Sequence, residues 1–368
     1  MTDPPPSPTP PLDRDALRRR FDRALEMLLD RQLDGIGFLG EDLGPVAAAL
    51  RQFVLTGGKR IRPTFVYWGY RGAGGAGGAA AEPVVRAACA VELLHVCALI
   101  HDDIMDGSRV RRGRPAMHVS FAELHQARRW RGEPDAFGEG AAILMGDLAF
   151  TWADAGLTSS GLPPERLVAA LEVFNVLRSE MMGGQYLDLI EAQRGAVDEA
   201  AVQRVLIYKS GKYTVERPLH MGAAMAGADG HLAAVLAAYS AYGVPLGEAF
   251  QLRDDVLGVY GSPEVTGKPA GDDLREGKET YLVLRARERS GPAGLRLLES
   301  SLGDAKLSED AVEALRALIA DCGALAETEA RIGALVGRAR AAIDDQAVAP
   351  EARAALDELA VIVTDRDA

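Results

Sequence analysis

Apolar residues recur at intervals of three and four along most of this chain, which is the spacing of an amphipathic helix. Alanine, leucine, arginine and glutamate, which favour helices, dominate the same segments, and strand signals are weak throughout. The pattern predicts helices over residues 14–33, 43–55, 84–106, 141–155, 202–209, 215–226 and 232–259, with others opening at Pro63 and Pro163-Pro164 and continuing beyond residue 278. We therefore expect an all-α fold.

Glycine and proline mark the places where this helical pattern is interrupted. Residues 69–81 are rich in glycine and alanine and predict a flexible loop, residues 109–115 predict a basic loop, and residues 261–278 an irregular one. Gly243 and Pro245 are possible breaks inside the helix predicted over residues 232–259. No repeat period or linker divides the chain, so residues 13–368 are expected to form a single helical domain.

The N-terminal segment differs from the rest in composition. Met1 to Pro11 holds six prolines and no lysine or arginine, so it lacks the regions of a secretory signal, and residues 1–12 are expected to be a disordered, proline-rich tail. No uncharged run is long and apolar enough to span a bilayer, and residues 232–247 come closest. A soluble, cytoplasmic protein without a transmembrane segment is expected.

Composition and charge narrow the choice of partners. Apolar residues make up 48% of the chain, enough for a large core, and the net charge of −12 argues against nucleic acid as the main partner. The three cysteines, Cys89, Cys97 and Cys322, show no clustered spacing, which excludes a disulfide framework and a zinc pattern. Buried thiols in a reducing cytosol are expected.

The first candidate site combines acidic and basic residues. Asp102, Asp103 and Asp106 end an apolar helix, where they repel one another and the negative end of the helix dipole disfavours them. Their oxygens suit Mg²⁺, which often bridges carboxylates to phosphates, although a solvated acidic helix end is the simpler alternative. Four arginines follow within six residues: Arg109, Arg111, Arg112 and Arg114. Because arginine binds phosphate oxygens bidentately, the pair of clusters favours a metal-bridged diphosphate over a surface ion-pair network.

A second acidic pair, Asp254 and Asp255, lies much further along the chain, in the segment Phe250-Gln251-Leu252-Arg253-Asp254-Asp255. Helical bundles commonly build metal sites from carboxylates on facing helices. The two acidic patches could therefore face each other across the core and hold a metal cluster.

At this point the sequence resembles a known family, the head-to-tail trans-isoprenyl diphosphate synthases, which include the farnesyl and geranylgeranyl diphosphate synthases. The segments that carry the resemblance occur in the family's order: Gly57-Gly58-Lys59-Arg60-Ile61-Arg62-Pro63, His101-Asp102-Asp103-Ile104-Met105-Asp106, Tyr208-Lys209-Ser210-Gly211-Lys212-Tyr213, Gln251 to Asp255, and Gly267-Lys268 to Asp272. The resemblance implies a single-domain helical bundle of the isoprenoid-synthase type with a central active-site cavity. It covers roughly residues 43–282.

One position departs from the family's pattern. The second acidic motif of the family usually ends in a third aspartate, where this chain has Gly258. Because the first aspartate of that motif, here Asp254, is the main ligand in the family, the metal site is expected to survive with weaker binding on that side.

The resemblance implies three Mg²⁺ ions that grip an allylic diphosphate. Asp102 and Asp106 would hold two ions and Asp254 the third, with Asp103 and Asp255 acting through coordinated water. Substrate would also be bound by basic and polar residues that match the family. For the allylic diphosphate these are Arg111, Lys209 and Lys268, for isopentenyl diphosphate Lys59, Arg62, His95 and Arg112, with Gln251 and Lys278 as further substrate-binding residues.

The reaction implied is ionisation of the allylic diphosphate, condensation with the double bond of isopentenyl diphosphate, and elimination of a proton. Developing charge on the departing diphosphate must be stabilised, with Lys209, Gln251, Lys268 and Arg111 as the catalytic candidates. A homodimer is the family's usual assembly.

Product length depends on the wall below the first acidic motif. Ala98 lies one turn before Asp102 on nearly the same helix face, with Cys97 beside it. In the family, bulky aromatic residues at these two positions stop growth at farnesyl diphosphate. Both residues are small here, which favours geranylgeranyl diphosphate as the main product. Alternatively, the small residues only allow close helix packing, and farnesyl or longer (C25 and above) products remain the runners-up.

Three other functions are weighed against this prediction. A class I terpene cyclase should carry a different second metal motif and needs no isopentenyl diphosphate site, and a head-to-head synthase is disfavoured on the same ground. The intact first acidic motif argues against a catalytically inactive regulatory subunit, although Gly258 in the second motif leaves that alternative open.

Overall fold

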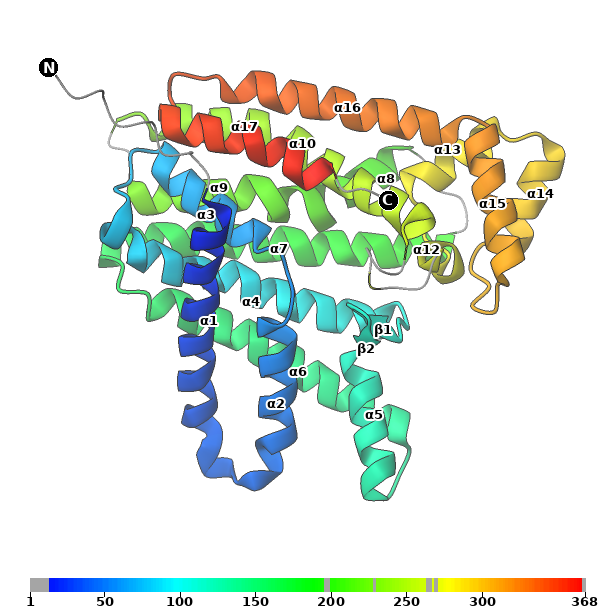
Figure 1. Ribbon diagram of the computed structural model, residues 1–368, viewed down its shortest axis with the longest axis horizontal. Coiled ribbons are helices and arrows are strands. Elements are labelled where there is room, and N and C mark those ends of the chain that lie inside the picture. The colour runs from blue at the N-terminus through cyan, green and yellow to red at the C-terminus, as the bar shows by residue number, and fades with distance from the viewer. Residues whose placement is uncertain (1–12, 195–198, 228–229, 263–266, 268–270, 366–368) are drawn as a thin grey trace, which may run out of the picture.

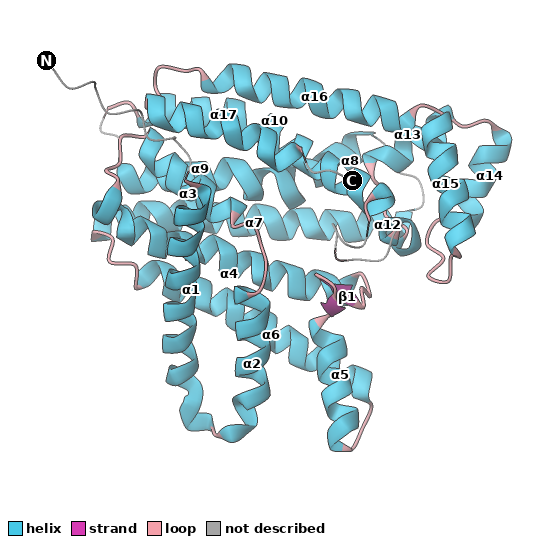
Figure 2. Ribbon diagram, viewed as in Figure 1, coloured by secondary structure: helices cyan, strands magenta, loops and turns pink. Residues whose placement is uncertain are grey.

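The computed structural model describes residues 13–194, 199–227, 230–262, 267 and 271–365 (Figure 1). The predicted proline-rich tail, residues 1–12, lies outside the described residues. Helices make up nearly all of the described chain, and Figure 2 shows a small strand pair as the exception. The predicted all-α fold is confirmed.

The first half of the chain runs through the following elements: α1 (Arg14–Ile36), the 3₁₀ turns η1 (Gly37–Leu39) and η2 (Glu41–Leu43), α2 (Gly44–Leu55), α3 (Ile61–Gly72), the 3₁₀ turn η3 (Gly78–Ala81), α4 (Glu82–Met105), β1 (Val110–Arg111), β2 (Arg114–Pro115), α5 (Met117–Arg128), α6 (Pro134–Thr158) and α7 (Pro164–Arg194). The second half continues with α8 (Glu199–Val205), the π-helix η4 (Leu206–Glu216), α9 (Arg217–Ala226), α10 (Leu232–Tyr260), α12 (Asp272–Glu276), α13 (Tyr281–Arg289), α14 (Pro292–Ser301), α15 (Glu309–Asp321), α16 (Ala324–Ile343) and α17 (Pro350–Thr364).

The long helices α4, α6, α7, α10 and α16 run along the long axis of the molecule, while α1, α2 and α5 run across it (Figure 1). The largest hydrophobic core joins side chains of α1–α7, η4, α9, α10, α16 and α17, while two smaller cores involve α8 and α12–α15 together with parts of η4, α10 and α16. The hydroxyl of Tyr242 on α10, for example, donates to the carbonyl of Leu356 on α17 at 2.7 Å. The single domain over residues 13–368 stays a prediction.

Helix α4 passes through the middle of this core, packed against α1, α3 and α6. It is apolar on nearly every side because neighbours surround it, as expected of a buried helix. Within the described residues, Gly78–Met105 is the stretch long and apolar enough to cross a membrane, and 72% of its most apolar window is buried. This stretch carries charged residues such as Arg86 and Glu92, so it is not one of the uncharged runs among which residues 232–247 are predicted to come closest.

The breaks predicted near Gly243 and Pro245 do not occur, because α10 is a continuous helix with both residues buried inside the bundle. Similarly, the interruption predicted between residues 209 and 215 is a π-helix, η4, that joins α8 to α9. Close packing explains both results. A Cβ atom on Gly247 of α10 would lie 2.4 Å from the carbonyl oxygen of Gly211 in η4, so the glycines serve backbone contact rather than chain reversal.

Three predicted loops contain more regular structure than expected. Helix α3 extends to Gly72, and η3 occupies the end of the segment 69–81. The basic loop, residues 109–115, folds into the β1–β2 hairpin, in which Arg111 pairs with Arg114. Of residues 261–278, the described part contains the short helix α12. Cys89, Cys97 and Cys322 are all free; Cys89 and Cys97 are buried as predicted, whereas Cys322 is only half-buried.

Candidate active site

A single cavity of about 1060 Å³ opens between the ends of α4, α7, η4, α10 and α12. Nearly all of the site residues predicted from sequence line it. These are Lys59, Arg62, His95, Cys97, Ala98, Asp102, Asp106, Arg111, Arg112, Lys209, Gln251, Asp254, Asp255 and Lys278. The fold therefore brings together residues from widely separated parts of the chain.

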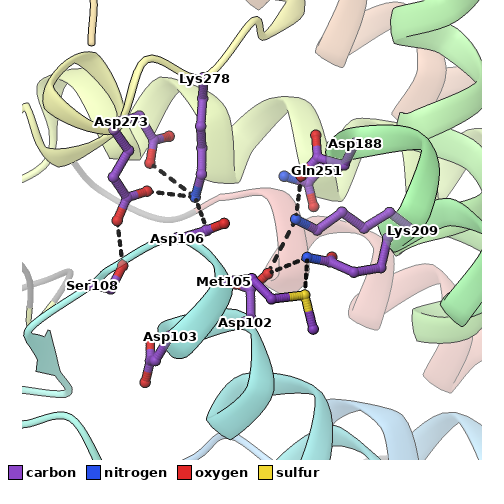
Figure 3. Close-up of polar contacts among 12 residues, drawn as sticks. Asp102, Asp103, Met105, Asp106, Ser108, Asp188, Lys209, Gln251, Asp273 and Lys278 are labelled. Atoms are coloured by element: carbon purple, nitrogen blue, oxygen red, sulfur yellow. Dashed lines mark hydrogen bonds and ion pairs between the residues drawn. The ribbon is translucent and has the colours of Figure 1, made fainter. Parts of the chain in front are cut away.

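Two predicted residues are not placed in this cavity. Lys268 lies outside the described residues. Asp103 is fully buried and accepts a hydrogen bond from Nε of Arg111 at 2.8 Å, and Figure 3 shows its side chain pointing away from Asp102 and Asp106. Asp103 therefore holds the hairpin arginine in place in this structure, and its contact with a metal through water stays a prediction.

Asp102 sits at the centre of a polar cluster. Its Oδ1 accepts hydrogen bonds from Nε2 of Gln185 at 3.0 Å and from Nζ of Lys209 at 3.3 Å, while Nζ of Lys209 also donates to Asp188 at 2.6 Å (Figure 3). Burial alone would raise the pKa of Asp102, but Lys209, Lys278 and Arg111 outweigh it and hold that pKa below its usual value. The carboxylate is therefore charged at neutral pH.

Asp106 is held by a second lysine. Nζ of Lys278 lies 3.2 Å from Oδ2 of Asp106 and 2.8 Å from Glu276, and it also approaches Asp273 at 3.7 Å (Figure 3). Burial, followed by repulsion from Asp102 and Glu276, raises the pKa of Asp106 even though Lys278 opposes the shift. Lys278 thus links the end of α4 to α12.

The second acidic patch lies on α10. Nε2 of Gln251 donates to Asp255 at 2.8 Å, and Asp254 lines the cavity beside it. Burial raises the pKa of Asp255 to about 8 despite the bond from Gln251, with Asp273 and Asp254 adding repulsion. A cation in this patch would relieve that repulsion.

Lys59, Arg62 and Arg112 form a basic wall in the same cavity as the acidic patches. Nη2 of Arg62 donates to the hydroxyl of Thr214 at 2.9 Å, and its guanidinium stacks 4.3 Å from the ring centre of Tyr213. The hydroxyl of Tyr213 is 2.8 Å from Nδ1 of His95. Burial, followed by the charges of Arg62, Arg112, Arg111 and Arg60, lowers the pKa of His95, so its ring is neutral at pH 7 and can offer one N–H donor.

Arg60 lies behind the basic wall and stabilises the segment that carries Lys59 and Arg62. It is only 2% exposed and has a left-handed backbone with φ of 51°. Its guanidinium donates to Glu92 at 2.6 Å, to Asp22 at 2.8 Å and to the carbonyl of Val54 at 2.7 Å. Its neighbours Lys59 and Arg62 also line the cavity, so the buried arginine fixes the segment that presents them.

The profile of the polyprenyl synthetase family matches residues 45–319. The chain belongs to this family. It is 33% identical over 317 residues to a geranylfarnesyl diphosphate synthase of Aeropyrum pernix, covering 85% of this chain and 91% of the relative. It is also 35% identical to a geranylgeranyl diphosphate synthase of Methanosarcina mazei, covering 75% of this chain and 76% of that one.

Solved structures agree with this assignment. A geranylgeranyl pyrophosphate synthase from Corynebacterium glutamicum, crystallised with isoprenyl diphosphate and magnesium, superposes with a TM-score of 0.92 at 38% identity, covering 97% of this chain and 100% of that one. The present chain is accordingly a prenyltransferase that elongates prenyl diphosphates, as predicted, in a family whose members typically depend on magnesium.

The residues of this prenyltransferase fit Mg²⁺. All candidate ligands are carboxylates, the hard oxygen donors that Mg²⁺ prefers, and apart from its ion pair with Lys278 the buried Oδ2 of Asp106 has no hydrogen-bond donor among the described residues. Over that part of the chain, no three His, Cys, Asp or Glu side chains converge into a complete cage. This arrangement suits ions that take their remaining ligands from a diphosphate and water.

Sequence reasoning missed two polar residues of α7. Gln185 and Asp188 line the cavity and contact Asp102 and Lys209 respectively. They lie three positions apart and therefore on one helix face. The sequence signal for them was a pair of polar residues on one face of a helix whose neighbouring positions are apolar, namely Met181, Met182 and Leu189.

The cavity wall below Asp102 is apolar. Cys97 and Ala98 of α4 line it, with Met181 and Met182 of α7. Cys97 is buried and Ala98 half-buried, and no aromatic side chain stands at either position. The predicted placement of both residues at the wall agrees with the structure.

Proposed function

We propose that this synthase condenses isopentenyl diphosphate with an allylic diphosphate and that geranylgeranyl diphosphate is its main product. The observation that carries the proposal is a single cavity with two acidic patches, a basic wall and an apolar extension lined by small side chains. A terpene cyclase binds no isopentenyl diphosphate and therefore does not need the basic wall of Lys59, Arg62 and Arg112.

The part of the cavity around the two acidic patches would promote ionisation of the allylic diphosphate. Three Mg²⁺ ions, held by Asp102, Asp106 and Asp254, would neutralise the charge that develops on the departing diphosphate. Lys209 and Lys278 keep their ammonium groups charged, because the carboxylates around them outweigh the effect of burial on their pKa values. Both can pair with diphosphate oxygens without leaving the cavity, which they already line.

The basic wall holds the second substrate. Lys59, Arg62 and Arg112 present positive charge to a diphosphate without a metal, and arginine does so bidentately. Neutral His95, oriented by Tyr213, adds one hydrogen-bond donor or acceptor at the same wall. The two diphosphates are thereby bound by different chemistry, which keeps their roles distinct.

The apolar extension receives the growing tail. Cys97 and Ala98 leave space where a bulky ring would close the cavity, which supports a C20 product. Farnesyl diphosphate or a longer product is the second candidate, since Met181 and Met182 are flexible and could set a different limit.

A homodimer acting in the cytoplasm is part of this proposal. The outer faces of α6 and α7 expose several large apolar side chains, more than a monomer normally leaves uncovered. They are Ile143, Leu144, Val168 and Val176. A second copy of the chain is the partner we propose for this face.

Purified protein should be incubated with isopentenyl and dimethylallyl diphosphates and Mg²⁺, and the products analysed by mass spectrometry after dephosphorylation. The expected main product is the C20 alcohol, and chelation of Mg²⁺ should abolish it. Cyclic hydrocarbons, or no condensation at all, would contradict the proposal. A C15 or C25 product would correct the length alone.

A further inference from the structure

The π-helix η4 carries side chains that reach both parts of the cavity. Near the first acidic patch, Nζ of Lys209 donates to Asp102 at 3.3 Å (Figure 3). Four positions later, the hydroxyl of Tyr213 lies 2.8 Å from Nδ1 of His95, and its ring stacks 4.3 Å from the guanidinium of Arg62 in the basic wall. A displacement of η4 would therefore disturb contacts in both parts of the cavity at once.

A π-helix of eleven residues needs support from its neighbours, because this conformation is rare and usually lasts for a single turn. Backbone packing supports the first half of η4. A Cβ atom on Gly184 of α7 would lie 2.2 Å from the backbone nitrogen of Lys209, and one on Gly247 of α10 would lie 2.4 Å from the carbonyl oxygen of Gly211. The second half of η4 makes its contacts with α7 through charged side chains instead.

Glu180 of α7 is the centre of these charged contacts. Arg217, which begins α9, donates to both of its carboxylate oxygens at 2.7 Å, and Nζ of Lys212 donates to Oε1 at 3.4 Å. Lys212 also lies 3.6 Å from Glu216, the last residue of η4. The side chains of Glu180, Lys212 and Arg217 are each only 18% exposed, so these contacts are shielded from solvent. Glu180 therefore connects the end of η4 to α7 by a bidentate pair, the strongest form of such a contact.

The same arginine extends the cluster to α10. Nη1 of Arg217 lies 3.3 Å from Nδ1 of His220. Because arginine can only donate, Nδ1 accepts and Nε2 carries the proton, which it donates to the carbonyl of Leu236 at 3.1 Å. Burial lowers the pKa of His220, which agrees with this neutral ring. One series of polar contacts thus joins α7, η4, α9 and α10.

We propose that Glu180 is a positioning residue for the condensation, because through Arg217 and Lys212 it holds η4 where Lys209 and Tyr213 meet the two substrates. The described residues that line the cavity include neither Glu180 nor Arg217, so the effect is transmitted by η4 and not by contact with substrate. The inference rests on the proposed function, since that function assigns the two parts of the cavity to the two diphosphates.

The charge of Glu180 is essential to this role. Burial alone would raise its pKa, but the hydrogen bonds and charge of Arg217, with a smaller contribution from Lys212, hold that pKa below its usual value. Glu180→Gln removes the charge and keeps the size of the side chain. The matched control is Asp154→Asn, which removes the partner of Arg178, an arginine that lies two positions before Glu180 on α7.

Hydrogen–deuterium exchange of residues 206–216 measures directly whether η4 is held. Glu180→Gln should speed exchange in this segment, because local opening follows the loss of local contacts. Asp154→Asn should leave exchange there unchanged. Exchange in the Glu180→Gln variant equal to that in the control would overturn the proposal.

Steady-state kinetics measures the consequence for the reaction. The values of kcat/KM for isopentenyl diphosphate and for the allylic substrate should fall together in Glu180→Gln, by roughly 10–100-fold, since a displacement of about 1 Å can have an effect of that size. Asp154→Asn should retain both values. A merely structural role would lower the melting temperature and leave kcat/KM per folded molecule unchanged. That result, or a loss confined to one substrate, would refute the inference.

A second variant keeps the test decisive if Glu180→Gln does not fold. Arg217→Lys retains the positive charge and loses the bidentate contact, so the same two measurements should change in the same direction by a smaller amount. Unchanged values in this folded variant would then overturn the proposal. Absence of condensation product from the unaltered protein would instead refute the proposed function. A synthase that forms product equally well with Glu180→Gln would refute this inference alone.

Discussion

The two ends of the cavity are built on different principles. At the diphosphate end, charged groups are fixed by directional contacts between distant elements, as when Lys209 of η4 reaches Asp102 of α4 and Asp188 of α7. At the tail end, the wall consists of Cys97, Ala98 and two methionines, which limit the tail only by their volume. The chemical reaction therefore depends on the identity of the charged residues at the diphosphate end. The length of the product depends on the size of the residues at the tail end.

The relatives are consistent with this division. Proteins named geranylfarnesyl, geranylgeranyl and farnesyl diphosphate synthases match this chain at 33%, 35% and 34% identity respectively. Similar overall identity thus accompanies three product lengths. A small number of wall residues can account for such differences, whereas the charged end must satisfy the same reaction in each case.

The largest effect should follow from Asp102→Ala. Removing a ligand from a site that must neutralise diphosphate should lower turnover by orders of magnitude. The fold should persist, since Lys209 keeps its contact with Asp188 and repulsion at the end of α4 is relieved. Steady-state kinetics with saturating Mg²⁺ measures the loss, and near-normal turnover would show that this carboxylate is not a ligand.

A second variant tests whether Arg60, which lies behind the basic wall, stabilises the fold. Arg60→Met should leave Glu92 buried and without its cation, which costs about 3–5 kcal/mol of unfolding free energy. Urea denaturation measures this loss. The control Arg353→Met breaks an exposed ion pair with Asp344 and should change stability little. Equal small losses in both variants would mean that the buried network is dispensable.

Lys59→Ala and Arg62→Ala should act on substrate binding. Each removes a charge-assisted contact with diphosphate worth roughly 1.5–3 kcal/mol, so the KM for isopentenyl diphosphate should rise about 10–150-fold. The KM for the allylic substrate should change far less, because the acidic patches bind it through metal. Initial rates, measured while the concentration of each substrate is varied in turn, give the two KM values. If only the KM for the allylic substrate rose, the assignment of the two substrate sites would have to be exchanged.

The smallest effect on rate should come from the tail end. Cys97→Phe or Ala98→Phe should shift output toward farnesyl diphosphate, because a packed wall yields little to an added ring. Mass spectrometry of the products provides the measurement. If both active variants keep the product distribution of the unaltered chain, the tail does not pass these residues.

Much of the fold and of the site could be predicted from sequence because local patterns carry that information. Helical periodicity located α4, and acidic and basic clusters identified Asp102 and Arg111. What could not be predicted depends on contacts between distant elements. Pro245 reads locally as a helix break, yet packing keeps α10 continuous.

The same limit applies within the site. Asp103 belongs to the acidic motif, but the fold buries it against Arg111, whereas Gln185 and Asp188 enter the cavity from a helix that shows no acidic cluster. The close packing of Gly258 against the side chain of Asp273 could not be predicted either, because the two residues lie on different helices, α10 and α12.

The division between the two ends is tested most directly by two single-turnover rates in one variant, Ala98→Phe. The rates are those of the C10-to-C15 and C15-to-C20 condensations with isopentenyl diphosphate. We predict that the first stays within about threefold of the rate in the unaltered synthase while the second is lost, since only the longer tail meets the new ring. Equal loss of both rates, or preservation of both, would contradict the account.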